Sequence, residues 1–87
     1  MTERDPLLQE REKTHGNFYK NALASQSIKQ VYRHNRTDDF LKVEHREALD
    51  MIALKISRIL SGKADEKDHW KDIAGYAKLG EEACDRN

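Results

Sequence analysis

Apolar residues recur every three or four positions through most of the chain, which is the spacing of one helix face. The pattern is strongest between residues 44 and 61. The apolar stripe there comprises Ala48, Leu49, Ile52, Ile56, Ile59 and Leu60. No segment alternates apolar and polar residues over a useful length, so no β-sheet is predicted. We therefore expect an all-α fold.

Helix start and stop residues divide this pattern into four segments. Asp5 and Pro6 suit a helix start, because an aspartate accepts from free backbone N–H groups and proline fits the first turn. Gly16 suits a helix end, because glycine tolerates the left-handed conformation that follows a helix, and Gly62 is the predicted stop of the third helix. We predict a small bundle of three main helices and a short N-terminal one, at about residues 6–14, 18–33, 44–61 and 68 towards 84.

The periodicity also predicts which face of each helix is buried. For the second helix the predicted face is Phe18, Ala22, Ser25, Ile28 or Lys29, and Tyr32. For the fourth helix it is Trp70, Ile73, Ala74 and Ala77. His69 is expected to be exposed in the first turn. Gly75 is expected where another helix or a ligand approaches the backbone, since a helical glycine costs about 1 kcal/mol relative to alanine.

The segment between the second and third helices is polar and is expected to form a loop. It covers residues 34–39. The apolar residues that follow it, Phe40, Leu41 and Val43, fit either an early helical turn or a loop that covers the core. The sequence does not choose between these two interpretations.

The chain is long enough for one domain, which we expect to span residues 1–87 with frayed ends at 1–5 and 84–87. Hydrophobic residues make up 37% and charged residues 37%, so much of each helix must face water. A core of this kind is small. Because association is a common way for such a chain to gain buried area, we expect a homodimer or a higher oligomer.

Charge and cysteine content exclude several classes of function. Sixteen basic residues balance sixteen acidic ones, so the basic surplus typical of nucleic-acid binding is missing over the chain as a whole, and only a local basic face is compatible with such binding. Cys84 is the single cysteine, which rules out an internal disulfide and leaves an inert thiol, and no two histidines have zinc-ligand spacing. No apolar run approaches the roughly 20 residues that span a bilayer. We expect an intracellular, cytoplasmic protein.

Two pairs of carboxylates stand at helical spacing and carry the candidate chemistry. The first carboxylate pair is Glu47 and Asp50, and the second carboxylate pair is Asp68 and Asp72. Carboxylate oxygens are preferred ligands of Mg²⁺, which binds nucleotide phosphates. The alternative is that these charges belong to ordinary solvated helix faces, where ion pairs contribute a few tenths of a kcal/mol.

Helix direction limits how the two pairs can meet. If the third and fourth helices pack antiparallel, the first carboxylate pair lies far from the turn between them and the second lies near it. We therefore expect Asp72 to contact Lys55 or Arg58, and all four carboxylates to meet only across a dimer. Lys55 and Arg58 are candidates for binding phosphate. His15 either contacts a phosphate or base, or caps the first helix at its C-terminus.

Three stretches of the chain resemble a family of small phage and prophage proteins. The first is Arg11-x-x-x-His15-Gly16-x-Phe18. The second runs from Arg46 to Gly62, and the third from Asp68 to Ala77, which reads DHWKDIAGYA. The resemblance covers residues 7–79 and implies a phage-encoded protein that acts in the host cytoplasm.

The chain also resembles, more weakly, the MazG-like all-α nucleoside triphosphate pyrophosphohydrolases. Those enzymes carry an E-x-x-E motif on one helix and an E-x-x-D motif on a later one. Glu44-x-x-Glu47 fits the first motif, Glu47-x-x-Asp50 is similar to it, and Asp68-x-x-x-Asp72 stands where the second is expected, with one extra residue of spacing.

This second resemblance implies a MazG-like helical hairpin core and a Mg²⁺-dependent hydrolase. Glu47, Asp50 and Asp72 would be catalytic, and Glu47, Asp50, Asp68 and Asp72 would hold the metal. Lys55, Arg58 and His15 would bind the substrate. The alternative is a non-enzymatic phage accessory protein that binds and inhibits a host protein or sequesters a nucleotide signal.

Overall fold

The computed structural model describes residues 5–35 and 41–86. These residues form four helices and no strand, which confirms the all-α prediction. The helices are α1 (Pro6–His15), α2 (Phe18–Asn35), α3 (Val43–Ser61) and α4 (Lys67–Ala83). Every predicted helix is present, with ends within two residues of the predicted positions. The predicted cap is also present, because Asp5 accepts from the Leu7 amide at 2.8 Å.

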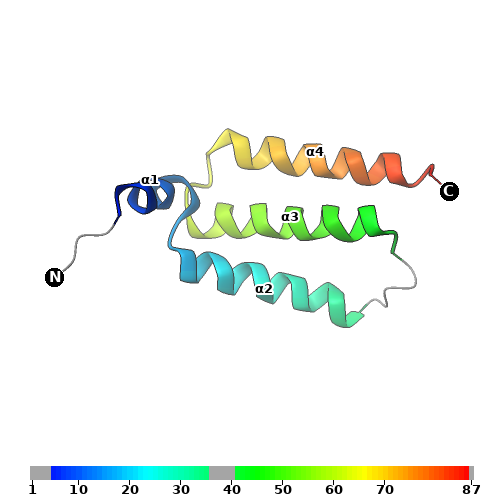
Figure 1. Ribbon diagram of the computed structural model, residues 1–87, viewed down its shortest axis with the longest axis horizontal. Helices are drawn as coiled ribbons and strands as arrows, with labels where there is room; N and C mark the ends of the chain where they lie inside the picture. The colour runs from blue at the N-terminus through cyan, green and yellow to red at the C-terminus, as the bar shows by residue number, and fades with distance from the viewer. Residues whose placement is uncertain (1–4, 36–40, 87) are drawn as a thin grey trace.

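The three long helices lie side by side in one layer with α3 in the middle (Figure 1). α3 packs against both α2 and α4, whereas α2 and α4 do not touch each other in the described part of the chain. α1 lies across one end of the layer and contacts α2 and α3. The two broad faces of α3 are therefore not covered by another long helix of the same chain.

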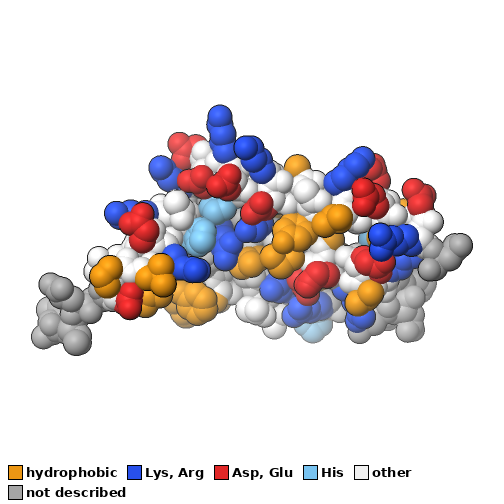
Figure 2. Space-filling view, turned by 45° about the horizontal axis from the view of Figure 1, so that its top comes forward, with side chains coloured by type: hydrophobic (Ala, Val, Ile, Leu, Met, Phe, Trp, Pro, Cys, Tyr) orange, Lys and Arg blue, Asp and Glu red, His pale blue; other side chains and the backbone are white. Residues whose placement is uncertain are grey.

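A flat layer buries little. The radius of gyration is 15.1 Å, against about 12 Å for a compact domain of this length. Among the described residues, the apolar side chains that are fully buried are Ala48, Ala53 and Ala83. Large apolar side chains that remain exposed include Val31, Leu60, Trp70 and Leu79, and hydrophobic groups reach the surface in several places in Figure 2. The structure thus leaves much apolar surface for a partner.

The interior is instead unusually polar. In the described parts of the chain the buried polar residues are Asn21, Ser25, Lys55, Ser57 and His69. Ser57, on α3, donates to the Asn21 side chain on α2, and Asn21 donates in turn to the His15 carbonyl at 2.8 Å. Buried polar groups need such partners, because an unpaired one costs about 1–3 kcal/mol. These bonds fix α2 against the end of α1.

The predicted buried face of α4 is wrong in most of its positions. Trp70 is 55% exposed and Ala74 and Ala77 are exposed, while only Ile73 is partly buried. His69, predicted to be exposed, is 2% exposed.

The orientation of α4 about its own axis is set by polar contacts, which the spacing of apolar residues does not predict. His69, Asp72, Gly80 and Ala83 face the neighbouring helices and form hydrogen bonds or an ion pair with them. Trp70 turns outwards and donates to the Ala64 carbonyl at 2.8 Å, which ties it to the turn before α4.

The face predicted for α2 is also partly wrong. Ser25 is buried and Tyr32 is partly buried, as expected, but Phe18 is 77% exposed. Asn21, which the apolar pattern leaves out, occupies the inner position at the start of the helix. The reason is the same as in α4, because hydrogen bonding rather than apolar burial decides which side faces inwards.

The predicted loop at 34–39 lies partly outside the described residues. His34 and Asn35 belong to α2 instead, whereas positions 36–39 and Phe40 are not described. Val43 is the first residue of α3, and Leu41 precedes the helix. The early-turn interpretation is therefore correct for Val43, whereas Leu41 lies in the segment that leads into the helix.

Candidate functional site

The candidate site forms where the ends of three helices meet. Gly16 follows α1 and Gly62 follows α3, and the two backbones touch: a Cβ on Gly62 would lie 2.6 Å from the Thr14 carbonyl oxygen. Gly16 has a φ of 81°, which favours glycine. The Lys63 amide donates to the same Thr14 oxygen at 3.3 Å. This contact sets the end of α1, and His15 with it, against the beginning of α4.

A pocket of about 350 Å³ opens at this junction, and we call it the Lys55 pocket. It is lined by Thr14, His15, Lys55, Arg58, Glu66, Asp68, His69 and Asp72. Five of the predicted site residues are therefore brought together: all three predicted to bind substrate, and the second carboxylate pair. Figure 2 shows histidine side chains beside basic ones on this part of the surface.

Lys55 and Asp72 form the central ion pair of the pocket. Lys55 Nζ lies 2.8 Å from Asp72 Oδ2, with the lysine side chain 11% exposed and the aspartate 45% exposed. This confirms the predicted contact between Asp72 and a base of α3. The hydrogen bond from Lys55 lowers the pKa of the Asp72 carboxyl, and the positive charges of Lys55, His69 and Arg58 act in the same direction.

The two histidines of the pocket lie next to each other. Their ring centroids are 5.6 Å apart, with planes inclined at 47°. His69 Nε2 is 3.1 Å from the Thr14 carbonyl oxygen, so this nitrogen carries the proton in the neutral ring. The pKa of His15 is lowered, first by burial and then by the nearby Arg58, His69, Lys55 and Arg11. His15 is the last residue of α1, so the structure accommodates both interpretations of it, as a helix-end residue and as a pocket residue.

Arg58 has a buried group without a protein partner. Its Nε is inaccessible and has no hydrogen-bond partner among the described residues. Arg58 lines both the Lys55 pocket and a groove of about 280 Å³ between α1, α2 and α3. Because its Nε is inaccessible, a ligand reaches that nitrogen only if the Arg58 side chain moves.

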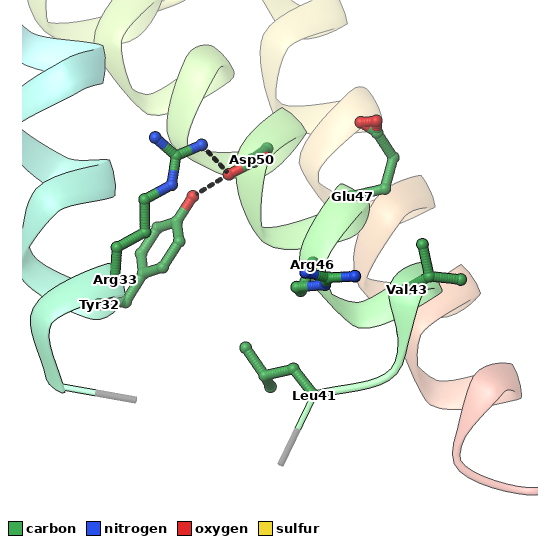
Figure 3. A pocket seen from close by; sticks show the side chains of 7 residues that line it. All are labelled: Tyr32, Arg33, Leu41, Val43, Arg46, Glu47 and Asp50. Atoms are coloured by element: carbon green, nitrogen blue, oxygen red, sulfur yellow. Dashed lines mark hydrogen bonds and ion pairs between the residues drawn. The ribbon is translucent and has the colours of Figure 1, made fainter. Parts of the chain in front are cut away.

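The first carboxylate pair lies elsewhere, at the opposite end of α3. It lines a second pocket, of about 500 Å³, with Tyr32, Arg33, Leu41, Val43 and Arg46 (Figure 3). Asp50 accepts from the Tyr32 hydroxyl and lies 3.3 Å from Arg33 Nη2, whereas Glu47 points away from it. Burial and the bond to Asp50 raise the pKa of Tyr32 well above its usual range.

The two carboxylate pairs therefore do not converge within one chain. Among the described residues, no group of three or more histidine, cysteine or acidic side chains is arranged to hold a metal ion. This agrees with the expectation that antiparallel helices separate the two pairs. A metal site built from both pairs requires a second molecule.

Sequence reasoning missed His69, Thr14 and Glu66 as parts of the pocket. His69 stands three residues before Asp72 and four before Ile73, so it shares their helix face, and this spacing could have placed it. Thr14 contributes its backbone carbonyl, for which the side-chain pattern gives no signal.

Cys84 is exposed, and its Sγ lies 3.6 Å from His45 Nε2. The same ring nitrogen is 2.9 Å from the Gly80 carbonyl oxygen, to which it donates. The nitrogen that faces the thiol is thus protonated, so it is not a base for activating it.

No helix in the described residues is both long and apolar enough to cross a membrane.

No curated protein and no solved structure matches the chain. A family model, described as a domain of unknown function (DUF6378), matches residues 3–84. That match extends from the segment before α1 through α4, and the chain belongs to the DUF6378 family.

Proposed function

We propose that this protein is a phage-encoded, MazG-like nucleotide-handling protein that binds the phosphate groups of a nucleotide in the Lys55 pocket. The observation that carries the proposal is the convergence of Lys55, Arg58 and His15, from two helices far apart in sequence, around one cavity. Cationic donors at fixed positions are what phosphate recognition requires. The cytoplasm of the host cell, where nucleotides are abundant, is the proposed place of action.

The place of Arg58 in the pocket lining supports this assignment. Its guanidinium has five donor hydrogens in a planar arrangement that matches phosphate oxygens. A bound phosphate would also favour the charged form of His15, offsetting the burial that keeps its pKa low in the free protein. Lys55 uses one of its three ammonium hydrogens on Asp72, so the others can donate to a phosphate.

The Lys55 pocket offers two carboxylates as ligands for Mg²⁺. Mg²⁺ is usually held by one or two carboxylates together with substrate phosphates, and Asp68 and Asp72 supply two at the pocket. When bound, the ion would neutralise phosphate charge and orient water. Glu47 and Asp50 would join it only from a second chain. The proposed reaction, hydrolysis of a nucleoside triphosphate to the monophosphate and pyrophosphate, therefore requires an oligomer.

The reaction is tested by incubating the protein with Mg²⁺ and a panel of ribo- and deoxyribonucleoside triphosphates and measuring pyrophosphate release. Glu47→Gln and Asp72→Asn each remove one carboxylate charge with little change of volume, so both should abolish turnover. Turnover that survives in both variants would exclude the carboxylates as catalytic groups. Nucleotide binding without turnover would limit the function to sequestration.

A second candidate function is a non-enzymatic accessory protein that binds a host protein. The observation in its favour is the exposure of large apolar residues such as Trp70 and Leu60, at 55% and 70%. Exposed aromatic residues are frequent anchors in protein interfaces. If no nucleotide binds, capture of one defined host protein that a Trp70→Ala variant fails to retain would favour this function.

A further inference from the structure

One broad face of α3 carries four residues at the spacing of a helix-packing seam. Glu47, Met51, Leu54 and Arg58 follow one another at steps of four, three and four, the spacing by which paired helices interlock. At about 100° per residue they share one side of α3. We call this stripe the Met51 seam.

The Met51 seam lies between the two flanks that α3 uses inside the chain. Lys55 contacts α4 on one flank, and Ser57 contacts α2 on the other. Met51 and Leu54 are only partly buried, and Glu47 is exposed. At its Leu54 and Arg58 end the seam also borders the groove between α1, α2 and α3, whereas its Glu47 and Met51 end is the more open part.

The order of charges along the Met51 seam makes it complementary to itself. It begins with the acidic Glu47, continues through Met51 and Leu54, and ends with the basic Arg58. In a two-fold antiparallel pairing of α3 helices, Glu47 meets the partner's Arg58 and Met51 meets the partner's Leu54. Each contact then occurs twice, as the symmetry of a closed dimer requires.

A parallel pairing in the same register would place Glu47 against the partner's Glu47 and Arg58 against the partner's Arg58. Like charges opposed in this way cost free energy, so the sequence of the seam selects the antiparallel arrangement.

Gly75 on α4 gives an independent indication on the same side of the molecule. It lines a shallow pocket with Asp72, Tyr76 and Leu79, and Tyr76 and Leu79 also line a pocket with Glu47. A Cβ built on Gly75 has nothing within 4 Å in the described chain. A glycine inside a helix is less favourable than alanine, and no contact among the described residues explains its presence at this position. The close approach of a helix from a second copy would explain why this position is a glycine.

Arg58 fits this pairing. Its side chain is only partly buried, and a guanidinium has five donor hydrogens, so Arg58 can hold the partner's Glu47 carboxylate and a phosphate together.

We propose that a second copy of this chain docks on the Met51 seam with its α3 antiparallel, so that the partner's Glu47 pairs with Arg58 at the rim of the Lys55 pocket. The dimer contact does not depend on nucleotide binding. Its consequence, that the partner supplies Glu47 to the metal and substrate, rests on the proposed function.

Charge reversal tests this contact directly. The mass in solution is measured by sedimentation equilibrium for the wild type, for Glu47→Arg and for Arg58→Glu, and circular dichroism verifies that each variant is helical. Either single reversal opposes like charges at both ends of the seam, so dimerisation should weaken by about tenfold or more. Glu81→Arg reverses an exposed charge on α4 away from the seam and should leave the dimer unchanged.

Mixing the two single variants is the decisive step. In the mixed dimer, both arginines of the Glu47→Arg chain face both glutamates of the Arg58→Glu chain, so association should return. A wild type that stays monomeric at high micromolar concentration would overturn the proposal, as would single variants that dimerise normally or a mixture that does not associate.

A crosslinking measurement keeps the test informative if a charge variant fails to fold. In a Cys84→Ser background, Met51→Cys mixed with Leu54→Cys should form a heterodimeric disulfide faster than Leu60→Cys mixed with Leu54→Cys, because Leu60 lies off the seam. Equal rates would contradict the register. Nucleotide binding by a protein that fails these tests would leave nucleotide binding at the Lys55 pocket standing and would remove the proposed hydrolysis, whereas a confirmed dimer without nucleotide binding would remove the proposed function alone.

Discussion

Lys55 and Asp72 join α3 to α4 by a 2.8 Å ion pair in which the ammonium is almost buried and the carboxylate is half-exposed. The two partners are therefore not equivalent. Removing the carboxylate leaves a buried charge without its counter-ion, whereas removing the lysine leaves a carboxylate that water can solvate.

We predict that Asp72→Asn destabilises the fold more than Lys55→Met does. The first change leaves the Lys55 ammonium unpaired, and the second replaces it with an apolar chain of similar length. Urea unfolding at pH 7 gives both free energies of unfolding. A greater loss of unfolding free energy in Lys55→Met than in Asp72→Asn would contradict the description of Lys55 as the more buried partner of the ion pair.

The Gly16–Gly62 contact should be among the most sensitive points of the backbone. A Cβ on Gly62 would lie 2.6 Å from the Thr14 oxygen and 2.8 Å from the Gly16 nitrogen, and backbone atoms cannot rotate away. We expect Gly62→Ala to lower the free energy of unfolding by about 2–4 kcal/mol.

Gly75→Ala is the matched control, because open space surrounds that position in the chain. It should raise the stability of the monomer by up to about 1 kcal/mol, measured at concentrations below dimerisation. Equal losses in the two variants would contradict the close approach of α1 to the end of α3.

Tyr32→Phe should cost about 1–2 kcal/mol, because it removes the hydrogen bond to the charged Asp50 and leaves the ring in place. Tyr19→Phe provides the control, since Tyr19 is 70% exposed. Thermal or urea unfolding measures both. Equal effects would indicate that the Tyr32–Asp50 bond does not persist in solution.

His15 should make the fold less stable as the pH falls below about 6.5. Its pKa is lowered in the folded state, so the unfolded chain takes up a proton that the folded protein resists. The loss of stability begins as the pH falls through the pKa of His15 in the unfolded chain, and it is complete below the pKa in the folded protein. Above neutral pH, His15 is neutral in both states and its ionisation does not change the free energy of unfolding.

The measurement is the free energy of unfolding between pH 7.5 and pH 5 for the wild type, His15→Gln and His34→Gln. His15→Gln should flatten the decline, and His34→Gln, at an exposed position of α2, should not. An identical decline in wild type and His15→Gln would contradict the burial of the ring.

The sequence predicted the helices well, because each rests on local signals. The Asp5 cap, the two glycine stops and the regular apolar spacing are readable without knowledge of the partner helices. It also predicted that Asp72 contacts Lys55 or Arg58, since antiparallel packing across a short turn brings these positions together, and the structure shows the Lys55 contact.

The orientation of the helices about their own axes was not predictable from apolar spacing. α4 faces its neighbours with His69 rather than Trp70, because the imidazole reaches a backbone oxygen of α1. That oxygen has no side-chain signature. The small core also made helix orientation hard to predict. The three buried alanines bury little apolar area, so apolar burial favours one orientation of a helix about its axis only weakly.

The most direct test of the proposed function is isothermal titration of the wild type with nucleotides in the presence of Mg²⁺, compared with Lys55→Met, Arg58→Met and Lys20→Met. Lys20 is an exposed lysine of α2 and serves as the control. We predict nucleotide binding that weakens about tenfold or more in the first two variants and stays within about twofold in the third. No binding by the wild type, or equal weakening in all three variants, would contradict the assignment of the Lys55 pocket.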